Sequence, residues 1–156
     1  MTSEELMRRA VARAEENVRS GSGGPFAALV ARNGVILGEG ANEVTATNDP
    51  TAHAEIVAIR AACRTLGSFR LAGCEIYTTC EPCPMCLGAV YWARLDRLYF
   101  AADRADAEHA GFDDGFIYRE LAAPPNARSL PMLRLLPEPA RAVLELWRLT
   151  PEKVPY

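Results

Sequence analysis

The fold is decided by residues 75–102, EIYTTCEPCPMCLGAVYWARLDRLYFAA. This stretch opens with an apolar run, Glu75 to Thr79, and closes with another, Arg97 to Ala102, and each run predicts a short buried strand. Pro84 can take the first position of a helix, where its missing N–H is not needed, so we expect a helix from Pro84 to about Arg94. Strands that alternate with a helix of this length predict right-handed crossovers and parallel pairing.

The alternation continues towards the N-terminus. Asn33-Gly34 accepts the positive φ angles of a type I′ turn and predicts a hairpin. The expected elements are a helix from Ser3 to Ser20, strands Phe26–Ala31 and Val35–Gly40, a polar loop Ala41–Asp49, a helix from Pro50 to Leu66 and a weaker strand Leu133–Leu136. We therefore expect a single domain, residues 1–156, of the α/β class: a three-layer α/β/α sandwich with a mixed sheet of about five strands.

Composition and charge narrow the class of protein. The chain has 156 residues, 49% of them hydrophobic and 24% charged, which is typical of a globular domain without a membrane span. The acidic start, Met1-Thr2-Ser3-Glu4-Glu5, is unlike a secretory signal, and five cysteines, an odd number, argue against a disulfide framework, so we expect a cytoplasmic location. A net charge of −3 without a basic tract argues against a long nucleic acid and favours a small substrate.

Two motifs carry the chemistry: His53-Ala54-Glu55, and Pro82-Cys83-Pro84-Met85-Cys86. One histidine and two cysteines suit zinc, and three protein ligands leave a fourth tetrahedral position open, as in catalytic sites. Cys83 and Cys86 share a helix face, and both motifs fall in the first turn of a predicted helix, where the positive dipole end favours thiolates. Glu55 is not needed as a ligand and is free to act as general acid and base.

Other interpretations of these residues stay open. Cys83 and Cys86 could be half of a structural zinc knuckle or a thioredoxin-like redox pair, but both readings leave Glu55 without a role. His53 alone could be a hydrogen-bonded core histidine. Cys80 also stands in C-x-x-C spacing with Cys83 and is interpreted as packing beside the metal, while Cys63 fits buried helix packing.

Four longer stretches extend the motifs: 48–55 (NDPTAHAE), 80–89 (CEPCPMCLGA), 91–94 (YWAR) and 110–118 (AGFDDGFIY). In these four stretches the chain resembles the cytidine-deaminase-like superfamily of zinc deaminases. Within that superfamily it resembles the small bacterial guanine deaminases. The resemblance runs from Pro25-Phe26 to Tyr156. The zinc motifs are specific to the superfamily. Phe112-Asp113-Asp114 and the terminal tyrosine narrow the resemblance to the guanine deaminases.

The resemblance implies hydrolysis of guanine, a purine base, to xanthine and ammonia, with one Zn²⁺ per subunit held by His53, Cys83 and Cys86 and with Glu55 transferring the proton. It implies a homodimer in which the C-terminal segment is swapped between subunits. The implied substrate contacts are ring stacking by Phe26 and His53, a hydrogen bond from Asn42 to the purine edge, the Ala54 backbone facing the reacting amino group, base binding and proton transfer by Asp114, a pocket wall at Trp92, and closure by Tyr156 of the partner.

Plainer roles remain for several of these residues. Phe26 and Trp92 could be packing, Asn42 a turn residue, and one of Asp113 and Asp114 a helix cap, while chain ends such as Tyr156 are usually frayed. At the level of function, the alternatives are a tRNA adenosine deaminase, a deaminase of another base or nucleoside such as cytosine or guanosine, and a non-catalytic zinc-binding module.

Overall fold

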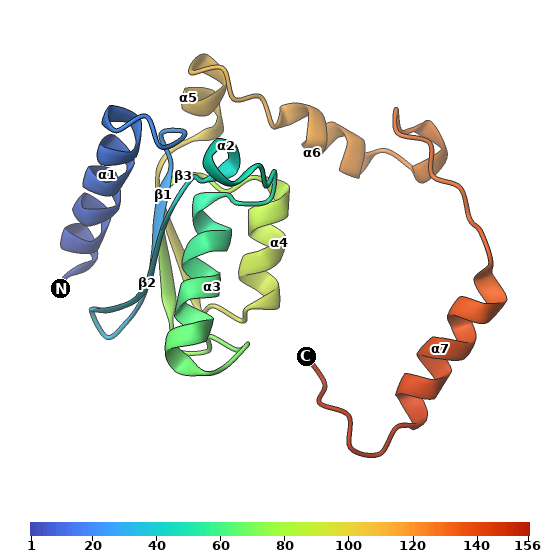
Figure 1. The fold of residues 1–156 in the computed structure, drawn as a ribbon. Coiled ribbons are helices and arrows are strands. Elements are labelled where there is room, and N and C mark those ends of the chain that lie inside the picture. The colour runs from blue at the N-terminus through green and yellow to red at the C-terminus, as the bar shows by residue number, and fades with distance from the viewer. The chain divides into compact units, whose positions relative to one another are not determined.

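A computed structural model describes residues 1–156, and the chain divides into two units, Met1–Gly115 and Phe116–Tyr156 (Figure 1). The first unit holds the sheet and five helices: α1 (Ser3–Arg19), α2 (Val44–Thr47), α3 (Ala54–Leu66), α4 (Pro84–Trp92) and α5 (Arg104–His109). Helix α6 (Gly115–Ala122) begins at the last residue of the first unit, and a 3₁₀ turn (Pro125–Ala127) and α7 (Pro137–Leu149) follow.

The sheet has four strands in the order β2-β1-β3-β4. They are β1 (Ala27–Arg32), β2 (Val35–Ala41), β3 (Glu75–Cys80) and β4 (Arg97–Ala102). Strand β1 is antiparallel to both β2 and β3, and only β3 and β4 are parallel. The predicted mixed α/β sheet is therefore confirmed, with one strand fewer than expected and with parallel pairing limited to the crossover through α4.

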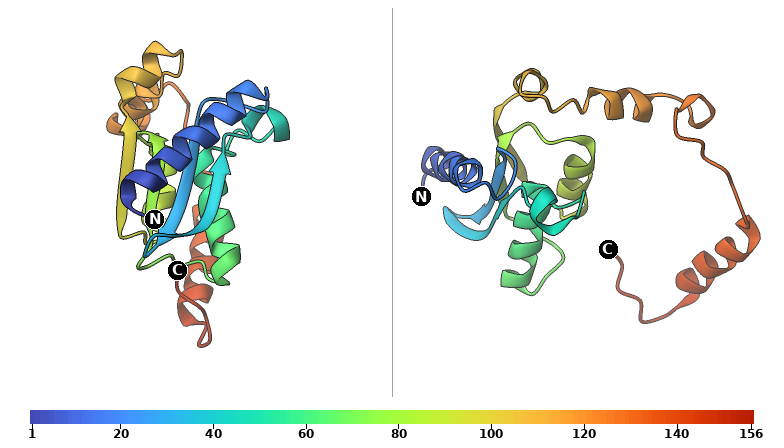
Figure 2. Two further views of the ribbon diagram at one scale, coloured as in Figure 1. Left: turned by 90° about the vertical axis from the view of Figure 1, so that its left-hand side faces the viewer. Right: turned by 45° about the horizontal axis from the view of Figure 1, so that its top comes forward.

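Helices cover both faces of the sheet, as predicted. Helix α1 packs on one face, against β1 and β3, and α3 packs on the other, against β2 and β1. Figure 1 shows α1 on one side of the strands and α3 with α4 on the opposite side, and the left view of Figure 2 looks onto α1 where it crosses the sheet.

Two glycines of β2 set how closely α3 approaches the sheet. A Cβ on Gly38 would lie 2.4 Å from the Ala58 carbonyl oxygen, and one on Gly40 would lie 2.5 Å from the Ala54 carbonyl oxygen. Ala54 and Ala58 are fully buried in this contact. Because any larger side chain would push α3 away, these glycines fix the position of the helix that begins directly after His53.

Two local structures follow from the residues that form them, and the second is the predicted hairpin turn, which is confirmed. The Thr2 hydroxyl accepts a hydrogen bond from the Glu5 backbone N–H, and the Glu5 carboxylate accepts one from Thr2, which completes a capping box at the start of α1. Asn33 and Gly34, between β1 and β2, have φ angles of 52° and 77°, as a type I′ turn requires.

Helix α3 begins at Ala54 and not at Pro50, so that expectation was wrong. The Asp49 side chain accepts a hydrogen bond from the Thr51 N–H at 2.8 Å, and the Asp49 carbonyl accepts one from Ala52. An aspartate that bonds the backbone two residues on forms a turn that competes with a helix start. His53 is thereby the N-cap of α3, with an extended backbone.

Two further differences concern segments predicted as loop or strand. The expected loop Ala41–Asp49 contains the short helix α2. The expected strand Leu133–Leu136 does not form, because no other strand pairs with it. Pro131 and Pro137, which cannot donate to a ladder, flank that segment.

None of the helices is both long and apolar enough to cross a membrane.

Candidate metal centre and active site

Three predicted ligands come together in the first unit. His53 precedes α3, whereas Cys83 and Cys86 lie at the start of α4. His53 Nδ1 lies 3.6 Å from Cys83 Sγ and 3.5 Å from Cys86 Sγ, and all three ligand atoms lie within 4.8 Å of one another. This is the one group of three or more histidine, cysteine and acidic side chains in the chain that could hold a metal.

The spacing of these donors fits zinc. A histidine nitrogen about 2.0 Å and a thiolate about 2.3 Å from zinc, at a tetrahedral angle, lie roughly 3.6 Å apart. Both nitrogen-to-sulfur distances match that edge. Two thiolates and one imidazole are also soft-to-borderline ligands. Such ligands bind zinc in preference to magnesium or calcium, which favour oxygen ligands.

The sequence places Cys83 where its thiol proton is easily lost. Cys83 is the N-cap of α4, so its sulfur faces the unpaired N–H groups at the positive end of the helix. The hydrogen bond from Cys86 lowers the pKa of Cys83 to about 4, and a second one from His53 adds to it. The same hydrogen bond, together with burial, raises the pKa of the Cys86 thiol. The pair thus holds one proton, which a metal ion has to displace.

Glu55 stands beside the ligands on a buried helix turn. It is the second residue of α3 and only 7% exposed. Burial raises the pKa of its carboxyl group, and a hydrogen bond with Cys86 acts in the opposite direction. A carboxyl group with a raised pKa next to a metal site can take up a proton during a reaction and release it again.

The two adjacent aspartates have different surroundings. The Asp113 carboxylate accepts a hydrogen bond from the Gly115 N–H at 2.8 Å, and Asp113 therefore caps the start of α6. Asp114 is partly buried, and the pKa of its carboxyl group is raised by desolvation and then by the negative charge of Cys83. The Asp114 carboxyl group therefore interacts electrostatically with one of the proposed metal ligands, Cys83.

Phe26 and Asn42 lie together, immediately before β1 and immediately after β2, and we call this pair the Phe26–Asn42 wall. The Asn42 N–H donates to the Phe26 carbonyl at 2.9 Å. The Asn42 side-chain oxygen accepts a hydrogen bond from the Val44 N–H at 3.3 Å, which leaves its NH₂ group as the donor. The next N–H, that of Glu43, donates to the carbonyl of Ala52, the neighbour of His53. The wall is thus tied through the backbone to the metal ligand.

Two residues that sequence reasoning left without a role belong to this region. Phe112 contacts Phe26 edge to face, with ring centroids 4.8 Å apart and an interplanar angle of 78°. The Asn17 amide donates to backbone carbonyls at the wall. Phe112 stands in one of the stretches that carry the family resemblance, but no pattern in the sequence singles out Asn17.

Three other predicted site residues differ in their position and in how exposed they are. Ala54 is the first residue of α3, next to His53, and is fully buried. Trp92 is the last residue of α4, is 63% exposed, and has the Arg94 guanidinium 5.8 Å from its ring centroid. Tyr156 belongs to the second unit and is 74% exposed. Trp92 thus lies at the opposite end of α4 from Cys83.

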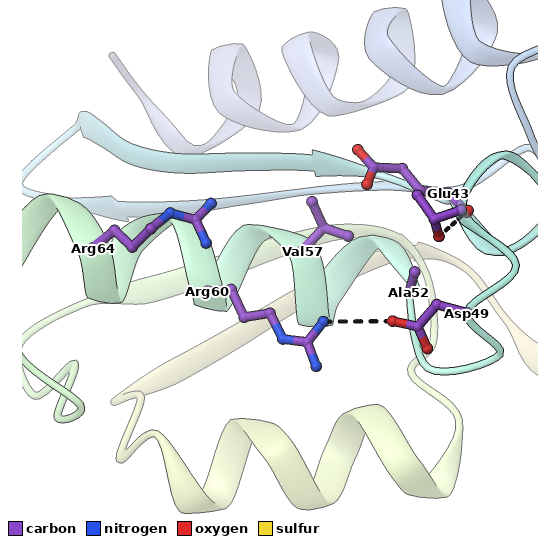
Figure 3. Close-up of a pocket in the computed structure, with 7 residues that line it drawn as sticks. Glu43, Asp49, Ala52, Val57, Arg60 and Arg64 are labelled. Carbon is purple, nitrogen blue, oxygen red and sulfur yellow. Dashed lines mark hydrogen bonds and ion pairs between the residues drawn. The ribbon is translucent and has the colours of Figure 1, made fainter.

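A hollow of about 240 Å³ lies between α2 and α3, and its lining is charged (Figure 3). An ion pair of 3.8 Å joins Arg60 to Asp49 across it. The lining residues are Glu43, Thr47, Asp49, Ala52, Val57, Arg60 and Arg64. None of the three metal-ligand candidates lines it, so this hollow is separate from the metal centre.

Comparison with known proteins places the chain in a family. The family model of the cytidine and deoxycytidylate deaminase zinc-binding region matches residues 1–102. The guanine deaminase of Bacillus subtilis (strain 168) is 47% identical over 156 residues, 100% of this chain and 100% of that protein. The crystal structure of guanine deaminase from Bacillus subtilis superposes with a TM-score of 0.96 at 47% identity, covering 100% of this chain and 99% of that one.

The chain also matches, over a shorter stretch, a protein with a different activity. The tRNA-specific adenosine deaminase of Aquifex aeolicus (strain VF5) is 42% identical over 87 residues, which is 56% of each chain. The superfamily resemblance carried by the zinc motifs is confirmed by the family model, and the guanine deaminase resemblance by a relative that matches from end to end. This chain belongs to the cytidine and deoxycytidylate deaminase family of zinc-binding proteins.

Proposed function

We propose that this chain is a zinc-dependent guanine deaminase, which converts guanine and water to xanthine and ammonia. The observation that carries the proposal is the cluster of His53, Cys83 and Cys86 with Glu55 beside it. The full-length similarity to a guanine deaminase supports the choice of substrate. The acidic net charge of −3 supports a small purine base over a nucleic acid.

His53, Cys83 and Cys86 are the proposed ligands of one zinc ion per subunit. Held by these side chains, zinc would supply a water nucleophile that loses its proton near neutral pH. Carbon 2 of guanine is amidine-like: a C–O bond forms there, the C–N bond to the exocyclic amino group breaks, and the nitrogen leaves as ammonia.

Glu55 is the proposed proton carrier. Its carboxylate takes one proton of the attacking water and passes it to a ring nitrogen. It then takes the remaining proton of the added hydroxyl group and gives it to the departing amine, which leaves as ammonia. Burial suits Glu55 to this role, because it raises the pKa of the carboxyl group towards the pH at which the proton has to be held and released. Asp114 binds the base on the other side and assists the proton transfer, supported by its partly buried position near the charge of Cys83.

The Phe26–Asn42 wall is the proposed recognition surface. The flat purine stacks between Phe26 and His53, while the Asn42 NH₂ group donates to an acceptor on the purine edge. The Ala54 backbone faces the amino group that leaves, and Trp92 lines the outer part of the pocket. A site with donors fixed in this way disfavours bases without a matching acceptor, because a buried donor would be left unpaired.

The proposed active form is a homodimer in which each subunit is one deaminase domain, residues 1–156, with the C-terminal segment swapped. Tyr156 of one subunit then closes the pocket of the other. The exposed apolar residues of the second unit, such as Leu133, Leu135 and Leu144, support an assembly that covers them. The five free cysteines support a reducing compartment such as the cytoplasm.

The test is ammonia release from purified, zinc-loaded protein offered guanine, guanosine, adenine, cytosine and a tRNA anticodon stem-loop in parallel. Turnover confined to guanine is expected. Turnover of the stem-loop would instead indicate the activity of the tRNA deaminases. Turnover of guanosine or cytosine would mean that the residues proposed to recognise guanine were assigned wrongly. No turnover of any substrate by protein that contains zinc would leave a non-catalytic zinc-binding module.

A further inference from the structure

We infer that Asn17 is a positioning residue for purine binding, because its buried amide holds the Phe26–Asn42 wall against the rest of the first unit. The inference rests on the proposed function, in which that wall binds guanine. Asn17 lies two residues before the end of α1 and is 2% exposed. A buried amide is costly unless its hydrogen bonds are made, so its partners indicate why it is there.

The Asn17 NH₂ group donates both of its protons to backbone carbonyls, one in the wall and one just before it. One goes to Gly24 at 2.9 Å, two residues before Phe26, and the other goes to Asn42 at 3.0 Å. A single side chain thus joins the segment that leads into β1 to the segment that follows β2. Asn17 is the residue of α1 whose side chain bonds both segments.

The packing around Asn17 leaves the two segments little freedom to change their spacing. A Cβ on Gly23 would lie 2.1 Å from the Asn42 carbonyl oxygen and 2.9 Å from the Asn17 side-chain nitrogen. On the far side, the Asn42 N–H is bonded to the Phe26 carbonyl. Asn42 is therefore held from two directions, by Phe26 through its N–H and by Asn17 through its carbonyl.

This arrangement has a defined consequence for the site. The backbone of Asn42 determines where its NH₂ group meets the purine edge, and the path from Asn42 through Glu43 to Ala52 determines how far that group lies from His53. Loosening the wall changes the fit of the bound base but leaves the metal ligands and Glu55 where they are. Asn17 thus governs substrate affinity more than the chemical step.

The test compares Asn17→Leu, which keeps a similar volume without donors, with the wild type and with Leu6→Ala. Leu6 is a buried residue near the other end of α1, so its truncation weakens the packing of the helix without touching the wall. For Asn17→Leu we expect the KM for guanine to rise by about tenfold, kcat to change by less than about threefold, and zinc content to stay at one per chain. Leu6→Ala should lower the melting temperature and leave KM unchanged.

A second measurement does not depend on turnover. In Asn17→Leu, hydrogen exchange of the segments 22–26 and 42–44 should become at least roughly tenfold faster, while exchange at residues 83–87 stays as in the wild type. Should Asn17→Leu fail to fold, Asn17→Ser retains one donor and should show the same changes to a smaller extent.

An unchanged KM and unchanged exchange at the wall in either folded variant would overturn the inference and leave the proposed function standing. Wild-type protein that binds zinc but does not deaminate guanine would remove the proposed function and, with it, the inference.

Discussion

Apolar side chains are placed in opposite ways in the two units of this chain. In Met1–Gly115, residues such as Leu6, Leu29 and Ile76 are fully buried between the sheet and its helices. In Phe116–Tyr156 no helix has a buried residue, and Leu133 and Leu135 are 90% and 83% exposed. The first unit can therefore fold around its own core, whereas the second presents an apolar surface that needs a cover.

The same division appears in the comparisons. The zinc-binding family model ends at residue 102, and the tRNA deaminase match spans only 87 residues. The guanine deaminase relative matches all 156. The part with its own core thus carries the zinc-binding motifs that the family shares. This separation predicts that substitutions in the first unit affect catalysis and folding, and those in the second affect assembly.

The largest effect is expected for Glu55→Gln, which keeps the shape of the side chain and removes its ability to carry a proton. We expect kcat for guanine to fall by about 10³-fold, because general acid–base catalysis contributes on that scale, with zinc content unchanged. Ammonia release and metal analysis measure the two quantities. The matched control is Glu43→Gln, in the separate hollow between α2 and α3, which should retain wild-type kcat. A zinc-loaded Glu55→Gln protein with full activity would rule out the proposed mechanism.

The second unit is tested by Leu144→Glu in α7. The polar residues Glu138, Arg141, Glu145 and Arg148 share one face of this helix, and Leu144 is exposed among the apolar residues of the other. If a second subunit covers that apolar face, a buried unpaired charge should raise the dimer dissociation constant about 100-fold. Sedimentation or light scattering over a dilution series measures the change.

Glu138→Gln, on the polar face of α7, serves as the control and should leave the dimer intact. A wild-type protein that stays monomeric would refute the homodimer itself. A Leu144→Glu protein that stays as dimeric as the wild type would show that α7 lies outside the interface.

How far the sequence predicted the structure depends on whether a feature is set by nearby residues. His53, Cys83 and Cys86 could be predicted because they lie in short motifs whose local structure is set by nearby residues, such as Pro84 at the first position of α4. The start of α3 was misplaced because Asp49 bonds Thr51 locally, and this turn overrides the tendency of Pro50 to open a helix.

The remaining differences depend on contacts between distant residues. The expected strand Leu133–Leu136 had a suitable composition, but a strand needs a neighbour, and no strand of the sheet pairs with it. Asn17 could not be recognised, because its partners are backbone carbonyls at Gly24 and Asn42, and carbonyls are present at every residue. Each half of the metal site is a short motif that can be recognised in the sequence, whereas the carbonyl partners of Asn17 have no sequence signature.

A smaller effect, on stability alone, is expected from Tyr77 in the core of the first unit. Its hydroxyl group donates to Glu75 at 2.6 Å and lies 3.1 Å from the Ser3 hydroxyl, and burial followed by the Glu75 hydrogen bond raises its pKa to about 12. Below pH 10 the phenol is neutral in both the folded and unfolded states. Between pH 10 and 12 only the unfolded state ionises, so the free energy of unfolding should fall by about 1.4 kcal/mol per pH unit from this group.

Urea unfolding of wild type and Tyr77→Phe between pH 8 and 12 measures that slope. The variant is expected to be less stable near pH 8 because Glu75 loses a donor, and the difference should shrink by about 2 kcal/mol towards pH 12. Tyr91→Phe is the control, since Tyr91 is exposed on α4 and should leave the slope as in the wild type. Parallel curves for wild type and Tyr77→Phe would mean that Tyr77 ionises equally in both states.

The smallest effect is expected at Phe112, which belongs to the first unit but lies beyond the matched residues 1–102. Its edge-to-face contact holds the Phe26 ring, and such pairs contribute about 0.5–1.5 kcal/mol. Phe112→Leu should therefore raise the KM for guanine by roughly fivefold, with little change in kcat or zinc content. Phe69→Leu, an exposed phenylalanine without this contact, should leave KM unchanged. A fall in kcat with KM constant would place Phe112 closer to the reacting atoms than to the stacking ring.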